Sequence, residues 1–266
     1  MTTEWPEETP EYWEEVTKIV DQNPPSDTFK TDWVAKKVPL YSKKMTSFDV
    51  IYLSEVMEFI DSLPDPRPVC KALRERPNGH SYESYHDSVF SPTRQLEKIS
   101  VWTVKSLHHW VALDKLSSAR FKLHEYDHII EVGAGIGETA RMAYDAFNFK
   151  GKYTIVDLPA IAQFSKKNLE GYPIEFVTDL KDLFAHGKTL VISTWGLSET
   201  ELDFRKQLFD TVGRCDVFVA FQSQIFGIDN RDYFIKYLPS EYNKSVRIQN
   251  IPMHTIDGGN FYLFAD

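Results

Sequence analysis

Residues 128–140 read HIIEVGAGIGETA: an apolar run meets an acid, then three glycines at alternate positions, then residues able to open a helix. Glycines at a strand-to-helix turn let the backbone take positive φ and let a ligand approach the main-chain N–H groups closely. The unpaired amides at a helix start, with the helix dipole behind them, suit a carboxylate or a phosphate. The stretch therefore predicts a cradle for a nucleotide cofactor rather than a plain tight turn, without naming the cofactor.

The composition is that of an acidic globular chain. Its 266 residues, 42% of them hydrophobic, suffice for one large domain or a compact domain with a cap. The net charge of −9 argues against a nucleic-acid partner, because phosphate binding needs a basic surface. No run approaches the ~20 apolar residues of a membrane span, and the acidic N-terminus shows no signal peptide. We therefore expect a cytoplasmic protein without a membrane partner, and reduced thiols at Cys70 and Cys215.

The first 120 residues read as helices and loops. Their spacing predicts helices over residues 11–20, 48–63 and 91–113, the last with Ser91 as its N-cap. A polar loop rich in Gly, Ser, His and Tyr lies between the last two. We expect this region to be a helical extension that caps the site, contacts the substrate or forms a homodimer interface.

From residue 128 onward, strand-like and helical segments alternate. The predicted strands are 128–132, 153–158, 175–177, 190–194, 216–222, 245–251 and 260–264, and the predicted helices are 137–148, 160–169, 201–213 and 230–237. Five strands alternating with helices predict a mostly parallel sheet, and the last two, joined without a helix, predict an antiparallel hairpin. The expected fold is α/β: a seven-stranded, mostly parallel, doubly wound sheet over residues 121–266, ending in that hairpin and preceded by the α-helical extension.

The end of the second predicted strand adds an acid to the glycine turn. Asp157 follows Gly137 by twenty residues, and a carboxylate there can accept both hydroxyls of a ribose or cap the next helix. Both NAD and S-adenosylmethionine carry such a ribose. A dinucleotide fingerprint would place its third glycine at position 138, which is Glu138, a poor neighbour for a pyrophosphate.

The pattern E-x-G-x-G-x-G, with Asp157 and the terminal hairpin, resembles motif I and the core of class I S-adenosylmethionine-dependent methyltransferases over about residues 120–266. The resemblance implies S-adenosyl-L-methionine as cofactor. It implies a backbone platform for the methionine end, oriented by Glu131. It also implies a ribose contact at Asp157 and an adenine contact at Asp179, which could equally cap the following helix. The full implied cofactor set is Glu131, Gly133, Ala134, Gly135, Gly137, Asp157, Leu158, Asp179, Leu180 and Thr194.

A second, looser resemblance concerns residues 157–159 and 192–199, which look like small-molecule O-methyltransferases and most like a sugar O-methyltransferase group. It implies methyl transfer to a hydroxyl of a sugar or another small molecule. Plant phenol O-methyltransferases place a His base after the fourth strand, where this chain has Thr194. A phenol-type mechanism with that base is therefore in doubt.

The base must then come from elsewhere on the same sheet edge. His254, between the last two strands, titrates near neutrality and is the first candidate, although a surface loop His fits equally well. Glu199 is the second, with a helix N-terminal acid as its alternative. The expected substrate contacts are Trp195, Tyr82, His86 and Arg94. The sequence shows no tight set of Asp, Glu and His side chains with metal-ligand spacing, so we predict no metal site.

Two other functions fit the same motifs less well. A catalytically degenerate binding protein would keep the fold and lose the chemistry, but the glycines and Asp157 are intact. An NAD(P)-dependent oxidoreductase is opposed by Glu138 and by the terminal hairpin. A nucleic-acid amino methyltransferase would bring an Asn/Asp-Pro-Pro-Tyr-like tetrapeptide after strand four, where this chain reads Ser-Thr-Trp-Gly.

Overall fold

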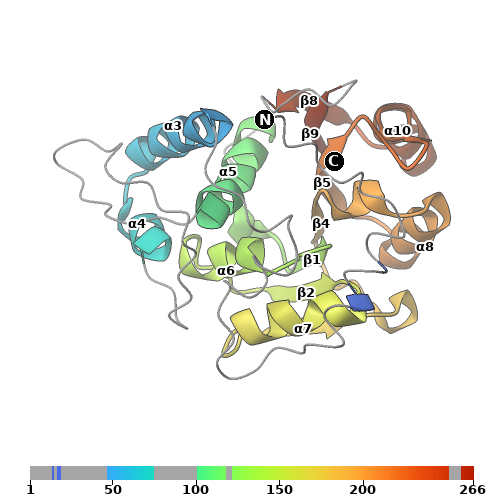
Figure 1. Cartoon of the computed structure of the whole chain (residues 1–266), viewed down its shortest axis with the longest axis horizontal. Coiled ribbons are helices and arrows are strands. Elements are labelled where there is room, and N and C mark those ends of the chain that lie inside the picture. The colour runs from blue at the N-terminus through green and yellow to red at the C-terminus, as the bar shows by residue number, and fades with distance from the viewer. Residues whose placement is uncertain (1–13, 15–16, 19–46, 75–100, 118–121, 252–258) are drawn as a thin grey trace.

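The computed structural model describes residues 14, 17–18, 47–74, 101–117, 122–251 and 259–266 (Figure 1). The helices are α3 (Ser47–Ser62), α4 (Arg67–Arg74), α5 (Val101–Leu116), α6 (Glu138–Asp145), α7 (Pro159–Asn168), α8 (Leu202–Val212), α9 (Asn230–Asp232) and α10 (Leu238–Tyr242). The main strands are β1 (His128–Val132), β2 (Lys152–Val156), β3 (Ile174–Val177), β4 (Thr189–Thr194), β5 (Asp216–Gln222), β8 (Val246–Ile251) and β9 (Asn260–Ala265). Predicted helix 11–20 and the start of predicted helix 91–113 lie largely outside the described residues.

The seven main strands form one sheet in the order β3-β2-β1-β4-β5-β9-β8. The first five strands pair in parallel, and β9 runs antiparallel between β5 and β8. The predicted α/β fold and its C-terminal hairpin are thus confirmed. Because Glu131 is in register with Ile155 and Ile192, the carboxyl ends of β1, β2 and β4 meet at one edge of the sheet. We call this the carboxyl edge.

Each face of the sheet has its own apolar core, since alternate strand residues point to opposite sides. On one face, Ile129, Ile192 and Phe218 pack with residues of α3, α4, α5 and α6. On the other face, Val191 and Val219 pack with residues of α8 and α10. Figure 1 shows these two groups of helices on either side of the strands. The described helices of the extension, α3, α4 and α5, therefore share an apolar core with the sheet.

Three elements differ from the sequence-based expectation. Helix α4 was not predicted from the sequence; it begins at Arg67, after the chain break that ends α3 at Ser62, and Pro68 is tolerated in its first turn. The chain after β5 adds a small hairpin of β6 (Gln224–Ile225) and β7 (Ile228–Asp229). The helix expected over 230–237 is instead α9, a π-helical segment η5 (Tyr233–Tyr237) and α10.

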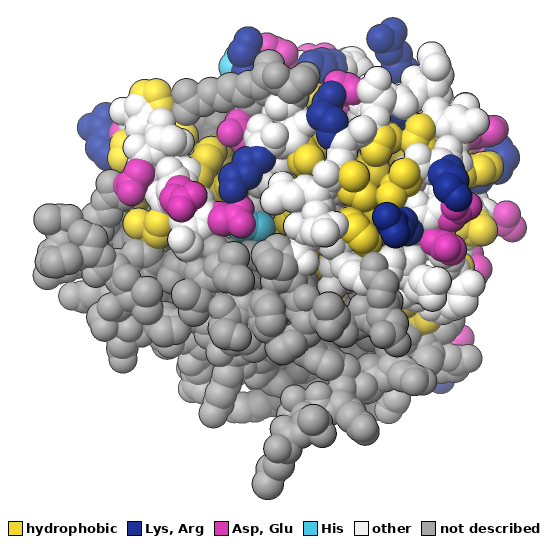
Figure 2. Space-filling model, turned by 90° about the horizontal axis from the view of Figure 1, so that it is seen from above, with side chains coloured by type: hydrophobic (Ala, Val, Ile, Leu, Met, Phe, Trp, Pro, Cys, Tyr) yellow, Lys and Arg dark blue, Asp and Glu magenta, His cyan; other side chains and the backbone are white. Residues whose placement is uncertain are grey.

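Surface features carry less information than the interior. Within the described part of the chain, no helix combines the length and apolar character needed to cross a bilayer. The face in Figure 2 shows basic and acidic side chains interspersed among the described residues.

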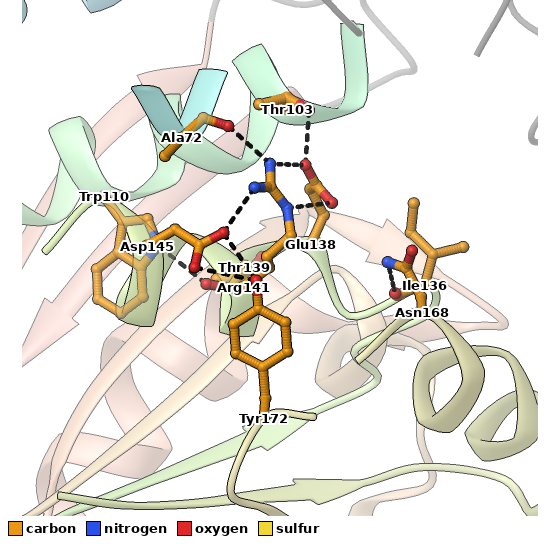
Figure 3. Close-up of polar contacts among 10 residues, drawn as sticks. All are labelled: Ala72, Thr103, Trp110, Ile136, Glu138, Thr139, Arg141, Asp145, Asn168 and Tyr172. Carbon is orange, nitrogen blue, oxygen red and sulfur yellow. Dashed lines mark hydrogen bonds and ion pairs between the residues drawn. The ribbon is translucent and has the colours of Figure 1, made fainter. Parts of the chain in front are cut away.

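A buried ionic network joins the helical extension to the start of α6 (Figure 3). The Arg141 guanidinium donates to Glu138 at 2.6 Å, to Asp145 at 2.9 Å and to the carbonyl of Ala72 in α4 at 3.1 Å. The Thr103 hydroxyl of α5 donates to Glu138 at 2.6 Å. Burial favours loss of the Arg141 charge, but the two carboxylates outweigh it and raise the pKa of Arg141. The network fixes α4 and α5 against the helix that follows the glycine turn.

Removing the cation of this network should destabilise the fold strongly. We expect Arg141→Leu to lower the free energy of unfolding by about 3–5 kcal/mol, because it leaves two carboxylates without their buried partner. The matched control is Arg67→Leu, because Arg67 forms an exposed ion pair with Asp65 and its replacement should leave the free energy of unfolding almost unchanged. Urea unfolding measures both. Equal losses in the two variants would contradict this role for the network.

Candidate functional site at the carboxyl edge

The glycine turn adopts the backbone that its sequence predicted. Gly133, Gly135 and Gly137 have φ of 72°, 55° and 78°, all in the left-handed region that favours glycine. Gly137 is the N-cap of α6, so the turn passes directly into the helix start. A Cβ on Gly133 would lie 2.7 Å from the Cα of Gly196, which follows β4. The loops after β1 and β4 are therefore in backbone contact.

Asp157 lies against this turn. Its Oδ2 accepts the N–H of Gly135 at 3.0 Å, and its Oδ1 accepts the N–H of Leu158 at 2.8 Å. Burial raises the pKa of Asp157 to about 7, against the lowering effect of these backbone donors. Leu158 beside it is 45% exposed, an unusual position for a large apolar side chain. The pair offers a hydrogen-bond acceptor and an apolar surface side by side.

Glu131 is fully buried at the end of β1. The Tyr153 hydroxyl donates to its Oε2 at 2.7 Å, while its Oε1 accepts no hydrogen bond from the described residues. Burial raises the pKa of Glu131 to about 7, Tyr153 opposes this, and the nearby charge of Asp157 adds to it. A buried carboxylate oxygen without a donor costs stability unless a ligand supplies one. Glu131 is therefore poised for a cationic or N–H donor.

The glycine turn is supported by residues that the sequence analysis did not single out. Asn168, at the end of α7, donates from Nδ2 to the carbonyl of Ile136 at 2.8 Å (Figure 3). The Leu169 side chain fills the space behind Gly137, where a Cβ would approach its Cδ1 to 2.4 Å. Glu138 bonds to Thr103 and Arg141, so its charge is neutralised within the network. The sequence identified Glu138 only as a poor neighbour for a pyrophosphate, and in the fold its carboxylate bonds within this network.

The loop after β4 stores backbone strain. Trp195 has φ 82° and ψ −46°, a conformation that bulky residues rarely adopt and that clusters at functional sites. Its N–H donates to the carbonyl of Ala220 at 2.9 Å, and its carbonyl accepts from the Ser198 hydroxyl at 2.6 Å. Trp195 is partly buried against the core on the α5 side of the sheet.

Arg205 of α8 holds the loop after β4 in place through hydrogen bonds. It donates to the carbonyl of Ser198 at 2.9 Å, to that of Thr200 at 2.8 Å and to Oδ1 of Asn230 at 2.7 Å. Burial lowers the pKa of Arg205 to about 10. The guanidinium lies over the ring of Tyr233, the first residue of the π-helical segment, at 4.9 Å from its centroid. Sequence reasoning missed Arg205 and Asn230, because only the tertiary fold brings them to this loop.

The other predicted site residues are placed as follows. Thr194 ends β4 and is partly exposed, and Glu199 lies in the short η4 turn (Gly196–Glu199). Asp179 caps the η3 turn (Leu180–Asp182) and pairs with Lys181, which lowers the pKa of Asp179. Leu180 is buried. The capping alternative for Asp179 is thus observed, and its adenine contact stays a prediction.

Four predicted residues lie outside the described part of the chain: His254, Tyr82, His86 and Arg94. Their roles stay predictions. Among the described residues, no group of three or more His, Cys, Asp or Glu side chains converges as a metal site would.

No protein-family model matches the chain, and no curated protein matches it. Among solved structures, it resembles the methyltransferase domain of bacterial CtHen1, at 14% identity over 62% of this chain and 100% of that one, with a TM-score of 0.47. It also resembles a SAM-dependent methyltransferase from Aquifex aeolicus (12%, 59% and 88%, TM-score 0.42). A third is geranyl diphosphate methyltransferase in complex with SAM (12%, 61% and 84%, TM-score 0.45). These likenesses say nothing about the reaction of this chain.

The contact between Gly133 and Gly196 gives a direct test of the turn. Gly133→Ala should lower the free energy of unfolding by about 2 kcal/mol more than Gly227→Ala does, because the new Cβ meets backbone that cannot give way. Gly227 is the matched control, since its φ of 76° carries the same strain but a Cβ there would meet no atom within 4 Å. Thermal or urea unfolding compares them. Equal losses would mean that the two loops do not touch.

Proposed function

We propose that this protein is an S-adenosylmethionine-dependent methyltransferase that transfers a methyl group to a hydroxyl of a sugar or another small molecule. The observation that carries the proposal is a pair of carboxylates, the buried Glu131 and the half-buried Asp157, around a glycine turn whose three glycines all have positive φ. S-adenosylmethionine is a cation with an ammonium group and a ribose. Its charge and its donors are complementary to this edge.

The residues present fit this cofactor at each end. Gly133, Ala134, Gly135 and Gly137 supply backbone for close approach to the methionine end, and the open Oε1 of Glu131 can accept from its ammonium group. Asp157 can accept from the ribose hydroxyls in place of the amide of Gly135. The exposed Leu158, with Leu180 and Asp179 at the end of β3, would border the adenine.

The same geometry disfavours a dinucleotide. A pyrophosphate is an anion, and the buried carboxylate of Glu131 next to the glycine turn would disfavour it, whereas Asp157 could accept from the ribose of either cofactor. Position 138 also lacks the glycine of the dinucleotide fingerprint. An NAD(P)-dependent oxidoreductase is therefore the weaker alternative. A degenerate binding protein would keep the same cofactor contacts, so only turnover separates it from an enzyme.

The bound cofactor would supply an electrophilic methyl group, and the protein would orient an acceptor hydroxyl in line with it. Such orientation can lower the barrier by up to roughly 7–11 kcal/mol. The loop after β4, with Thr194 and the strained Trp195 held through Ser198 and Arg205, would form the acceptor side. Tyr82, His86 and Arg94 would close over it. His254 and Glu199 are the sequence-predicted candidates for the base that takes the hydroxyl proton.

The raised pKa of Glu131 makes a stability and affinity prediction. Its pKa is about 7 in the folded chain against 4.5 ordinarily, so the folded state binds more protons and loses stability as pH rises from 4.5 to 7. We expect Glu131→Gln to be more stable than the parent at pH 8, by roughly 1–3 kcal/mol, and equal to it near pH 4.5. Its affinity for S-adenosylhomocysteine should fall at least about tenfold at pH 8.

The matched control is Glu175→Gln. Glu175 is exposed, and the hydrogen bond from Lys152 lowers its pKa, so its replacement should neither stabilise the fold at pH 8 nor weaken the cofactor. Urea unfolding at both pH values and calorimetric titration measure the two effects. A Glu131→Gln variant that binds S-adenosylhomocysteine as well as the parent would remove Glu131 from the cofactor site.

The activity itself is tested by methyl transfer from S-adenosylmethionine labelled on its methyl group. We expect label to enter one or more members of a panel of monosaccharides and small alcohols as an alkali-stable ether. The loss of transfer in Asp157→Ala would tie it to the site. Binding of the cofactor without transfer to any panel member would favour the degenerate binding protein.

A further inference from the structure

A chain of polar side chains connects α3, α5 and β9 on one face of the sheet. The Tyr262 hydroxyl lies 3.0 Å from Nδ1 of His108 and 2.9 Å from Nδ1 of His109. His108 Nε2 lies 3.4 Å from Oε2 of Glu55, which also pairs with Lys115. Tyr262 and His108 are buried, whereas His109 is partly exposed.

The chain lies beside the proposed acceptor site. Tyr262 is in register with Ala220, and Ala220 with Thr194 at the end of β4. Tyr262 and Ala220 belong to the core on the α5 side of the sheet, the side to which Trp195 also packs. Two strand spacings separate Tyr262 from Thr194, about 10 Å between Cα atoms. His109 contacts Tyr262 from α5 and so lies on the same side of the sheet as Trp195.

Proton counting selects one arrangement of this chain. Tyr262 has a single hydroxyl proton, so it donates to one histidine and accepts from the other. If it donates to His109, His108 must carry its proton on Nδ1 and would turn a bare Nε2 towards the carboxylate of Glu55. If it donates to His108, the His108 Nε2–H faces that carboxylate, which is attractive. His109 then carries its proton on Nδ1, and its Nε2 has an unprotonated lone pair.

Both rings are neutral near pH 7, because burial lowers the pKa of His108 to about 4 and that of His109 to about 3. A neutral imidazole has one nitrogen with a free lone pair, which can accept a proton. Nδ1 makes the only hydrogen bond of His109 to the described residues, the one to Tyr262. Its Nε2 makes no hydrogen bond to the described residues, and the side chain is partly exposed. His109 uses one and keeps the other available.

We propose that His109 is the general base of the proposed methyl transfer, set in its reactive tautomer by Tyr262, His108 and Glu55. The inference rests on the proposed function and names the group that takes the acceptor proton. As the acceptor oxygen bonds to the methyl carbon, the C–S bond breaks and its electron pair stays on sulfur. The hydroxyl proton moves to His109 Nε2, and its Nδ1 proton moves to Tyr262. The Tyr262 proton moves to His108, and the His108 Nε2 proton moves to Glu55.

Protons balance along this series of side chains, which ends at Glu55. One proton leaves the acceptor and one reaches Glu55, while the sulfonium cation becomes a neutral thioether. The side chain of Glu55 is 22% exposed, so it can release the proton to solvent. This gives the buried relay an exit that does not pass through the cofactor site.

The tautomers can be measured without any acceptor. We expect long-range proton–nitrogen NMR of the full chain, labelled at histidine nitrogens, to show His109 protonated on Nδ1 and His108 on Nε2, with His109→Gln assigning the signal. Tyr262→Phe should return His109 towards the mixed tautomers of an unconstrained imidazole. A proton on His109 Nε2 in the parent protein would overturn the proposal.

Calorimetric titration with S-adenosylhomocysteine on the same samples separates this inference from the function on which it rests. His109→Gln should bind it as the parent does; a parent that does not bind it contradicts the proposed function itself. With whichever monosaccharide of the panel is methylated, His109→Gln should lower kcat by at least about 100-fold with little change in KM. The matched control is His124→Gln, an exposed histidine, which should leave kcat unchanged. Loss of turnover in His254→Ala but not in His109→Gln would place the base elsewhere.

Discussion

The close approach of two backbone segments organises the carboxyl edge. Gly133, after β1, and Gly196, after β4, lie so near that neither position has room for a Cβ. This contact brings the glycine turn and the loop of Trp195 to one place, although more than sixty residues separate them in the chain. The parallel register of β1 and β4 makes the contact possible, and Asn168 and Arg205 hold its two sides.

Several residues at the carboxyl edge lower the stability of the folded chain. Glu131 is buried without a second donor, Asp157 has a raised pKa, and Trp195 is strained. Such costs persist where the surroundings fix them, and they cluster at sites that bind or react. The stabilising interactions lie next to this edge, in the Arg141 network and in the two apolar cores. They hold in place a site that a bound ligand would stabilise.

The sequence predicted the sheet well because its signals are local. Apolar runs, glycines and chain breaks gave the seven strands, the hairpin and the positive φ of the glycine turn. It could not identify Gly196, Asn168 or Arg205, because their roles depend on partners distant in the chain. For the same reason, the sequence analysis judged Glu138 only by its position after the glycines. In the fold, Arg141 pairs with its carboxylate and the Thr103 hydroxyl donates to it. The pairing of His108 and His109 through Tyr262 required β9 to lie beneath α5.

The central claim is that this edge binds a cationic nucleoside cofactor and not a dinucleotide. Isothermal titration of the purified protein with S-adenosylhomocysteine and, in parallel, with NAD⁺ tests it most directly. Micromolar binding of S-adenosylhomocysteine alone, tighter at pH 8 than at pH 6 as Glu131 and Asp157 ionise, is the predicted result. Binding of NAD⁺ alone, or of neither compound, would contradict the account.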